Sequence, residues 1–191
     1  MIFEKDTPED KLPKPAIRPY PTQWVSDWKL KDGTAVTIRP IRPEDEPAVV
    51  KFHEKLSERT VQMRYFHPMK LSQRTAHERL VRVCHSDYDR ETALVAELPS
   101  KEIIGVGRLS EVPGISEAEF AILVADQWQK KGLGTQFLSK LVEIGKAEKV
   151  EKITAEMLSE NIEMHKVAQR LGFTITKGKE INDPVHAELK L

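Results

Sequence analysis

Cysteine, long apolar runs and an excess of either charge are scarce or missing in this chain of 191 residues. The one cysteine, Cys84, cannot form an internal disulfide, so a reducing, cytoplasmic setting is the default expectation. No apolar run approaches the roughly 20 residues that span a membrane, and the N-terminal residues lack the apolar core of a signal peptide. A membrane-bound or disulfide-stabilised protein is thereby disfavoured.

Charge is balanced, with 30 Lys and Arg residues against 30 Asp and Glu residues. A nucleic-acid-binding domain needs a basic excess to contact phosphates, so no nucleic-acid partner is expected. The His-Glu pairs that begin at His53 and His77 lack the second histidine of a zinc motif, and no other group has metal-ligand spacing. We therefore expect no metal.

The first 28 residues are rich in proline and polar side chains and show little periodicity. This composition predicts a linker or arm for residues 1–28 and one globular domain for residues 29–191. Trp24 and Trp28, four residues apart, predict that the end of the arm packs as a lid on an apolar surface patch. The chain starts like the middle of a longer protein, so we expect an excised C-terminal domain.

Beyond the arm, hydrophobic periodicity predicts an α/β (α+β) fold, with a mixed, mostly antiparallel central sheet flanked by helices. Turn signals at Pro99 and Pro113 separate three strands and indicate an antiparallel meander. Ser72 is expected to cap one helix and Gly172 to end another. The predicted strands are residues 34–39, 92–98, 103–109, 118–124, 152–158, 173–176 and 186–191, and the predicted helices are residues 43–56, 58–66, 72–83, 133–149 and 161–171.

The most informative stretch is AEFAILVADQWQKKGLGTQFL, residues 118–138. Its order of apolar strand, glycine-containing loop and amphipathic helix can turn several unpaired backbone N–H groups towards one anion, at the positive end of a helix dipole. Lys130 and Lys131 add positive charge beside the loop. The alternative is an ordinary strand-to-helix turn with two solvated lysines.

The loop sequence QKKGLG resembles the acyl-CoA-binding motif of the GCN5-related N-acetyltransferases (GNAT), whose consensus is Gln/Arg-x-x-Gly-x-Gly/Ala. The resemblance covers residues from about 33 to 191, and includes TIRPIRPEDEPAVVKFHEKLSERTVQMRYF near the start and NIEMHKVAQRLGF near the end. Residues 19–66 and the AEFAILV strand are similar to the acetyltransferase domain of bacterial Pat-type protein lysine acetyltransferases. That domain is often fused to an acyl-CoA synthetase-like region.

This resemblance implies a GNAT fold with acetyl-CoA as co-substrate. In the family, loop amides hold the pyrophosphate and the preceding strand pairs with the pantetheine arm, so that a backbone N–H, here assigned to Leu123, faces the thioester carbonyl. Asn161 would contact the arm, cap its own helix, or do both. The implied acetyl-CoA-binding residues are Ile122, Leu123, Val124, Gln129, Lys130, Lys131, Gly132, Leu133, Gly134, Thr135 and Asn161.

Glu119 interrupts an otherwise apolar strand, so its carboxylate should face a cleft or a specific partner. In Pat-type enzymes the glutamate of the AEF segment is the catalytic base, and Glu119 is the matching position. Glu117 is the reserve candidate, because two-residue spacing places it on the same face of the strand. The alternative for Glu119 is a solvated carboxylate at the edge of a sheet.

The proton source for the departing thiolate is open at this point. Many GNAT members carry a tyrosine five residues before the phenylalanine of the Leu-Gly-Phe ending, whereas this chain has Ala168 there. Water, His165 or no acid at all are the alternatives, and His165 is also a candidate for an ordinary helix-surface residue.

The leading hypothesis is an acetyl-CoA-dependent N-acetyltransferase that modifies a protein lysine, with acyl-CoA synthetases among its targets. One rival is a small-amine or N-terminal acetyltransferase, which would need a narrow acidic pocket in place of an open groove. The other rival is a catalytically silent acyl-CoA-sensing module that regulates an attached synthetase.

Overall fold

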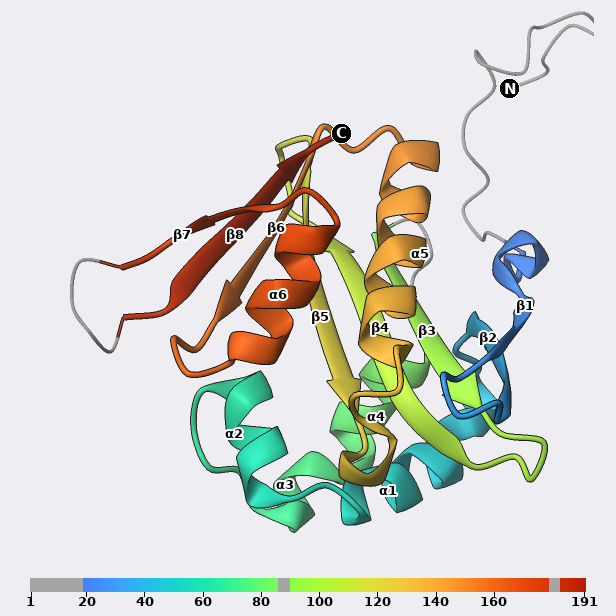
Figure 1. Ribbon diagram of the computed structural model, residues 1–191. Helices are drawn as coiled ribbons and strands as arrows, with labels where there is room; N and C mark the ends of the chain where they lie inside the picture. The colour runs from blue at the N-terminus through green and yellow to red at the C-terminus, as the bar shows by residue number, and fades with distance from the viewer. Residues whose placement is uncertain (1–18, 86–89, 179–182) are drawn as a thin grey trace, which may run out of the picture.

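One eight-stranded sheet runs through the part of the chain that the computed structural model describes, residues 19–85, 90–178 and 183–191 (Figure 1). Its strand order is β1-β2-β3-β4-β5-β6-β8-β7, and every neighbouring pair is antiparallel except β5 with β6. The mixed, mostly antiparallel sheet is therefore confirmed. The strands are β1 (Ser26–Lys29), β2 (Ala35–Pro40), β3 (Glu91–Glu97), β4 (Ile103–Glu111), β5 (Glu117–Val124), β6 (Lys152–Met157), β7 (Thr174–Thr176) and β8 (Val185–Lys190).

Helices cover both faces of the sheet, and a separate apolar core lies under each layer. Helices α5 and α6 lie on one face, while α1 to α4 gather over β3, β4 and β5 on the other (Figure 1). None of the described helices is both long and apolar enough to cross a membrane. The helices are α1 (Glu46–Glu54), α2 (Glu58–Tyr65), α3 (Leu71–Arg74), α4 (His77–Cys84), α5 (Leu133–Ala147) and α6 (Ile162–Arg170), with 3-10 turns at Thr22–Trp24, Pro43–Asp45 and Asp126–Trp128.

Alternation along β5 decides which side chains reach each layer. Ala118 and Phe120 are buried in the core beneath α5, whereas Leu123 belongs to the core beneath α1 to α4. Because neighbouring residues of a strand point to opposite faces, Glu117 and Glu119 share the face of Leu123. Both carboxylates therefore lie on the side of α1 to α4.

Two predicted segments differ from the structure by more than the ends of an element. The helix predicted from Ser72 is two short helices, since Arg74 turns inward to donate to the carbonyl of His53 at 3.1 Å, and Ser72 caps neither of them. No strand was predicted before residue 34. The structure nevertheless has β1 there, mostly within the end of the predicted arm, and this strand pairs with β2. Trp24 and Trp28 do pack against the core, as predicted, and residues 1–18 of the arm lie outside the described residues.

Glycines in β4 set the distance between the sheet and α5. A Cβ atom placed on Gly105 would lie 2.8 Å from the ring of Phe137, and one placed on Gly107 would lie 3.0 Å from the same ring. Phe137 is fully buried. The missing side chains on β4 thus let α5 pack closely against the strands that carry the candidate site.

Gly105→Ala tests this close packing. The added methyl group meets the Phe137 and Leu133 side chains and also the Leu123 carbonyl oxygen at 3.3 Å, so we expect a loss of about 1–3 kcal/mol in the free energy of unfolding. Urea denaturation measures this loss. Gly134→Ala is the control, because a Cβ there has no protein atom within 4 Å. Equal losses in both variants would contradict the packing argument.

His53 is a titratable side chain inside the core beneath α1. It is 6% exposed, contacts Phe52 edge-on, and its Nδ1 has no hydrogen-bond partner among the described residues. Burial, with smaller effects from the charges of Arg74 and Arg79, lowers the pKa of His53 from 6.5 to about 4. The folded protein therefore keeps this ring neutral in mildly acidic solution.

This pKa predicts acid-dependent stability. Below pH 6.5 the unfolded chain protonates His53 while the folded chain does not, so stability falls with pH until about pH 4, by about 3 kcal/mol in total. His53→Leu should remove that part of the decline in urea denaturation at several pH values. His67→Gln, at an exposed histidine, should follow the wild type. Parallel curves for wild type and His53→Leu would refute the assignment.

Candidate active site

Strands β5 and β6 start as a pair and then separate. Their parallel pairing joins Glu117 to Lys152, Ala118 to Ile153 and Glu119 to Thr154, and no later residues pair. Beyond Glu119, β5 continues along β4, whereas β6 follows β8 (Figure 1). Among the described residues, the side of β5 that faces away from β4 consequently has no strand partner from Phe120 onwards.

Alternation of the β4–β5 ladder identifies the open backbone groups. At one end of the ladder, the Ala125 N–H donates to the Ile104 carbonyl at 3.0 Å. At the other end, the Val112 N–H donates to the Glu117 carbonyl at 2.8 Å, and the register is continuous between these two pairs. Odd-numbered residues of β5 therefore direct their backbone groups to β4. The structure thus differs from the assignment of the thioester-facing N–H to Leu123, because the groups facing the opening belong to Ile122 and Val124.

The loop after β5 is tied to the start of α2. The Asp126 carboxylate accepts hydrogen bonds from the Ser57 N–H at 2.9 Å and the Thr60 hydroxyl at 2.8 Å. Burial raises the pKa of Asp126, but these hydrogen bonds lower it by more, so the net shift is downward. The Gln129 amide donates to both Thr60 and the Val124 carbonyl at 3.0 Å. The first motif residue therefore fixes the loop against α2.

The first turn of α5 presents free amides. Gly132 precedes the helix with a φ of 91°, and no described residue accepts a hydrogen bond from the backbone N–H of Leu133, Gly134 or Thr135. Three free N–H groups at the positive end of a 15-residue helix fit a phosphate or pyrophosphate. A Cβ on Gly134 would meet only open space, so the backbone is accessible there.

The two motif lysines have different surroundings. The Lys131 ammonium lies 2.9 Å from the Asp32 carboxylate and 4.4 Å from the centre of the Trp128 ring. Its hydrogen bond is the main reason why the pKa of Asp32 is lowered to about 2. Lys130 is exposed, with a φ of 60°, and has no ion-pair partner among the described residues. Much of the local positive charge of Lys131 is thus offset within the protein.

Glu119 is exposed at the point where β5 and β6 separate. Within the described part of the chain it accepts no hydrogen bond and forms no ion pair, whereas Glu117 lies 2.7 Å from the Lys152 ammonium. That contact raises the pKa of Lys152. Of the two candidates for the base, only Glu119 therefore has a carboxylate open to a substrate.

The candidates on α6 have structural partners. The Asn161 side chain accepts a hydrogen bond from the Met164 N–H at 3.4 Å. Asn161 therefore caps its own helix, which is one of the two roles expected for it. His165 Nε2 lies 3.1 Å from the Leu158 carbonyl oxygen, to which it must donate. Burial lowers the pKa of His165, against the opposing effect of that hydrogen bond. Ala168 is fully buried.

A cluster of arginines near Glu119 was not predicted. Arg64 of α2 and Arg79 of α4 each have their guanidinium carbon 5.0 Å from the centre of the Tyr65 ring, and Arg108 of β4 pairs with Glu91. Glu119 attracts the Arg64 charge across the same space. The three arginines are far apart in the sequence and follow no motif, so only the fold could reveal them.

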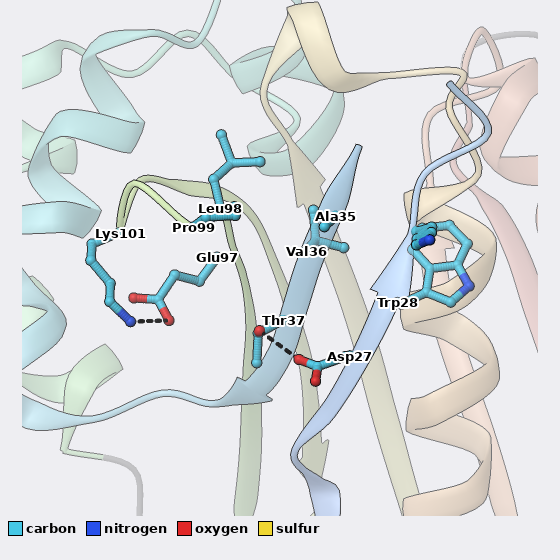
Figure 2. A pocket seen from close by; sticks show the side chains of 10 residues that line it. Asp27, Trp28, Ala35, Val36, Thr37, Glu97, Leu98, Pro99 and Lys101 are labelled. Carbon is cyan, nitrogen blue, oxygen red and sulfur yellow. Dashed lines mark hydrogen bonds and ion pairs between the residues drawn. The ribbon is translucent and has the colours of Figure 1, made fainter. Parts of the chain in front are cut away.

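One cavity among the described residues lies elsewhere. It has a volume of about 460 Å³ and is bounded by β1, β2 and the turn between β3 and β4 (Figure 2). Figure 2 shows the Thr37–Asp27 hydrogen bond and the Lys101–Glu97 ion pair beside it. None of the predicted site residues lines this cavity. The candidate site is the side of β5 that no described strand pairs with, where an extended ligand would complete the sheet.

Known proteins share both the sequence pattern and this architecture. Residues 35–174 match the family model of the acetyltransferase (GNAT) domain. An acetyltransferase of Pseudomonas aeruginosa is 25% identical over 150 residues, which cover 78% of this chain and 80% of that protein. The GNAT domain of S. lividans PAT is 28% identical with a TM-score of 0.81, covering 91% of this chain and all of that one.

A CoA-containing structure shares the fold at lower identity. Mycobacterium smegmatis RimJ in complex with CoA-disulfide is 18% identical, with a TM-score of 0.66 over 87% of this chain and 86% of that chain. The family match spans most of the chain and includes β5, its open side and the α5 turn. The chain therefore belongs to the GNAT family of acetyltransferases, enzymes that use acetyl-CoA as acyl donor.

Proposed function

We propose that this enzyme transfers an acetyl group from acetyl-CoA to the ε-amine of a protein lysine, with Glu119 as general base. The observation that carries the proposal is the free, exposed carboxylate of Glu119 at the divergence of β5 and β6. A lysine amine is protonated at neutral pH because its pKa is about 10.4, so the reaction needs a group that removes protons. The resemblance to Pat-type protein lysine acetyltransferases, together with the similarity to the GNAT domain of S. lividans PAT, supports a protein lysine as acceptor.

The donor side follows from the open backbone groups. The free amides of Leu133, Gly134 and Thr135 would hold the pyrophosphate of acetyl-CoA, and the outward groups of Ile122 together with the Val124 N–H would pair with its extended arm, since the Val124 carbonyl already accepts from Gln129. An N–H group of this strand edge would stabilise the negative charge that develops on the thioester oxygen. Acetyl-CoA supplies an activated acyl group, and these residues orient it.

The acceptor side lies on the face of Glu119. The amine approaches Glu119, which takes its proton directly or through one water as the new C–N bond forms and the C–S bond breaks. The neighbouring strands add polar side chains to the same face, since Thr154 pairs with Glu119 across β5 and β6, and Glu188 pairs with Thr154 across β6 and β8. Glu156 and His186 continue this largely acidic surface. Such a surface is suited to a lysine carried by a folded partner.

An acyl-CoA synthetase is the proposed protein acceptor, on the resemblance to Pat-type enzymes. The test incubates the protein with labelled acetyl-CoA and a synthetase, and locates acetyl-lysine by mass spectrometry. Transfer to one synthetase lysine is the expected result. Transfer only to small amines or N-termini would support the first rival, and acetyl-CoA binding without any transfer would support the sensor.

Glu119→Gln tests the base. The amide cannot take a proton, so we expect kcat to fall by about 10²–10⁴-fold while acetyl-CoA binding by calorimetry is unchanged. Glu117→Gln is the matched control on the same strand face. It removes the ion pair with Lys152, so its main effect should be on stability, and its kcat should stay close to that of the wild type. If Glu117→Gln abolishes turnover and Glu119→Gln does not, the assignment of the base is wrong.

Gly134→Ala tests the pyrophosphate site. The new methyl group meets no protein atom, so the fold should remain intact, but it enters the space beside the free amides. We expect the Kd for acetyl-CoA to rise by about tenfold, equivalent to about 1.4 kcal/mol. Lys146→Ala, in the exposed last turn of the same helix, should bind as the wild type does. Unchanged affinity in Gly134→Ala would place the pyrophosphate elsewhere.

A further inference from the structure

Three guanidinium groups, those of Arg64, Arg79 and Arg108, lie together on the face of the sheet that carries Glu119. Arg64 and Arg79 both lie against the Tyr65 ring, at 5.0 Å from its centre. Arg108 is paired with Glu91, which also accepts from the Ser110 hydroxyl at 3.0 Å. Within the described residues, neither Arg64 nor Arg79 forms an ion pair.

Partial burial makes this arrangement costly in the absence of an anion. All three arginines are only partly accessible, and the Nε atoms of Arg79 and Arg108 are buried with no hydrogen-bond partner among the described residues. Burial is the main reason why the pKa of Arg64 is lowered; repulsion from Arg108 and Arg79 acts in the same direction, and Tyr65 and Glu119 oppose it. A guanidinium that has lost water and gained no acceptor is destabilised until an anion binds.

The position of the cluster identifies which substrate could supply that anion. Arg108 and Ser110 lie in β4 directly beside β5, where Ser110 pairs with Glu119. Arg64 and Arg79 approach from α2 and α4, on the same face of the sheet as Glu119. The free amides proposed for the acetyl-CoA pyrophosphate are at the other end of β5, beyond Val124. The cluster therefore adjoins the acceptor.

We propose that Arg64 and Arg79 form an anion-binding subsite for a carboxylate of the acceptor, held next to the amine that Glu119 deprotonates. This inference rests on the proposed function and specifies its acceptor: the target lysine has an acidic side chain close to it in space. Planar guanidinium groups bind carboxylates through two parallel hydrogen bonds, which gives both energy and orientation. Stacking on Tyr65 holds both guanidinium groups in place before binding.

Lysine peptides provide the primary test. Peptide pairs that differ only by aspartate or asparagine at one position near the lysine are compared by kcat/KM, through release of the CoA thiol. We expect the wild type to prefer the best aspartate peptide over its asparagine partner by about tenfold or more, as for hydrogen bonds between charged groups. Arg64→Gln and Arg79→Gln should each reduce that preference to about twofold or less.

Matched controls separate binding from general charge and folding effects. Arg59→Gln on α2 and Arg82→Gln on α4 remove the same charge from exposed positions of the same helices and should keep the preference. Arg79→Lys retains the charge but cannot form the two parallel hydrogen bonds, so this variant should keep only part of the preference for the aspartate peptide. A wild-type enzyme that does not distinguish the aspartate peptide from the asparagine peptide overturns the subsite.

A direct binding measurement decides the case in which no peptide is acetylated. In protein labelled with ¹⁵N-arginine, glutarate should shift the Nε–H signals assigned to Arg64 and Arg79 in the presence of CoA, and Arg59 should not respond. Shifts without transfer to lysine peptides would retain the subsite and reject the protein lysine as acceptor. Transfer to free amino acids, but not to their decarboxylated analogues, would identify the α-carboxylate as the ligand of the subsite. No shift together with lysine transfer would reject the subsite and retain the proposed function.

Discussion

The separation of β5 from β6 is the constraint on which the rest of the structure depends. An unpaired strand edge inside a sheet carries backbone donors and acceptors, and leaving them unpaired costs free energy unless water or a ligand forms hydrogen bonds with them. Here that edge lies between two strands of the same sheet, because β6 pairs with β8 while β5 remains with β4. An extended ligand can therefore complete the hydrogen bonding of β5, and in the proposed reaction its reactive end would lie beside Glu119.

The surrounding elements hold this opening rigidly. On one face, Gly105 and Gly107 let Phe137 pack against β4, which brings the free amides of α5 to the end of β5. On the other face, Asp126 and Gln129 connect the same loop to the start of α2. Since α2 also carries Arg64 and Tyr65 at its far end, one short helix links the donor side of the site to the acceptor side. A shift of α2 would change both sides together.

Local patterns predicted most of the elements and the position of the loop, but they missed β1 and the break between α3 and α4. The apolar run of β5 and the periodicity of α5 identified both correctly, because burial and helical spacing are properties of consecutive residues. Two kinds of feature were not accessible in this way. The direction of the Leu123 N–H depends on the β4 register, and the meeting of Arg64 with Arg79 and Arg108 depends on three elements that are separate in the chain. Long-range pairing sets both, and no local signal encodes it.

Charge is distributed unequally around Glu119, and this asymmetry bears on the chemistry. Guanidinium groups lie on the side of α2 and α4, whereas Glu188, Glu156 and the ion-paired Glu117 lie towards β6 and β8. An ammonium group is attracted over the acidic strands, but it becomes less stable as it approaches the arginines, because like charges favour the neutral amine. In the proposed mechanism, loss of the amine's proton to Glu119 would relieve that repulsion at the point where the nucleophile is needed. A carboxylate bound to the arginines would offset part of the repulsion between the arginines and the ammonium group. The acceptor's carboxylate therefore has to lie near enough to the amine to orient it, and far enough from the amine that the neutral form is still favoured.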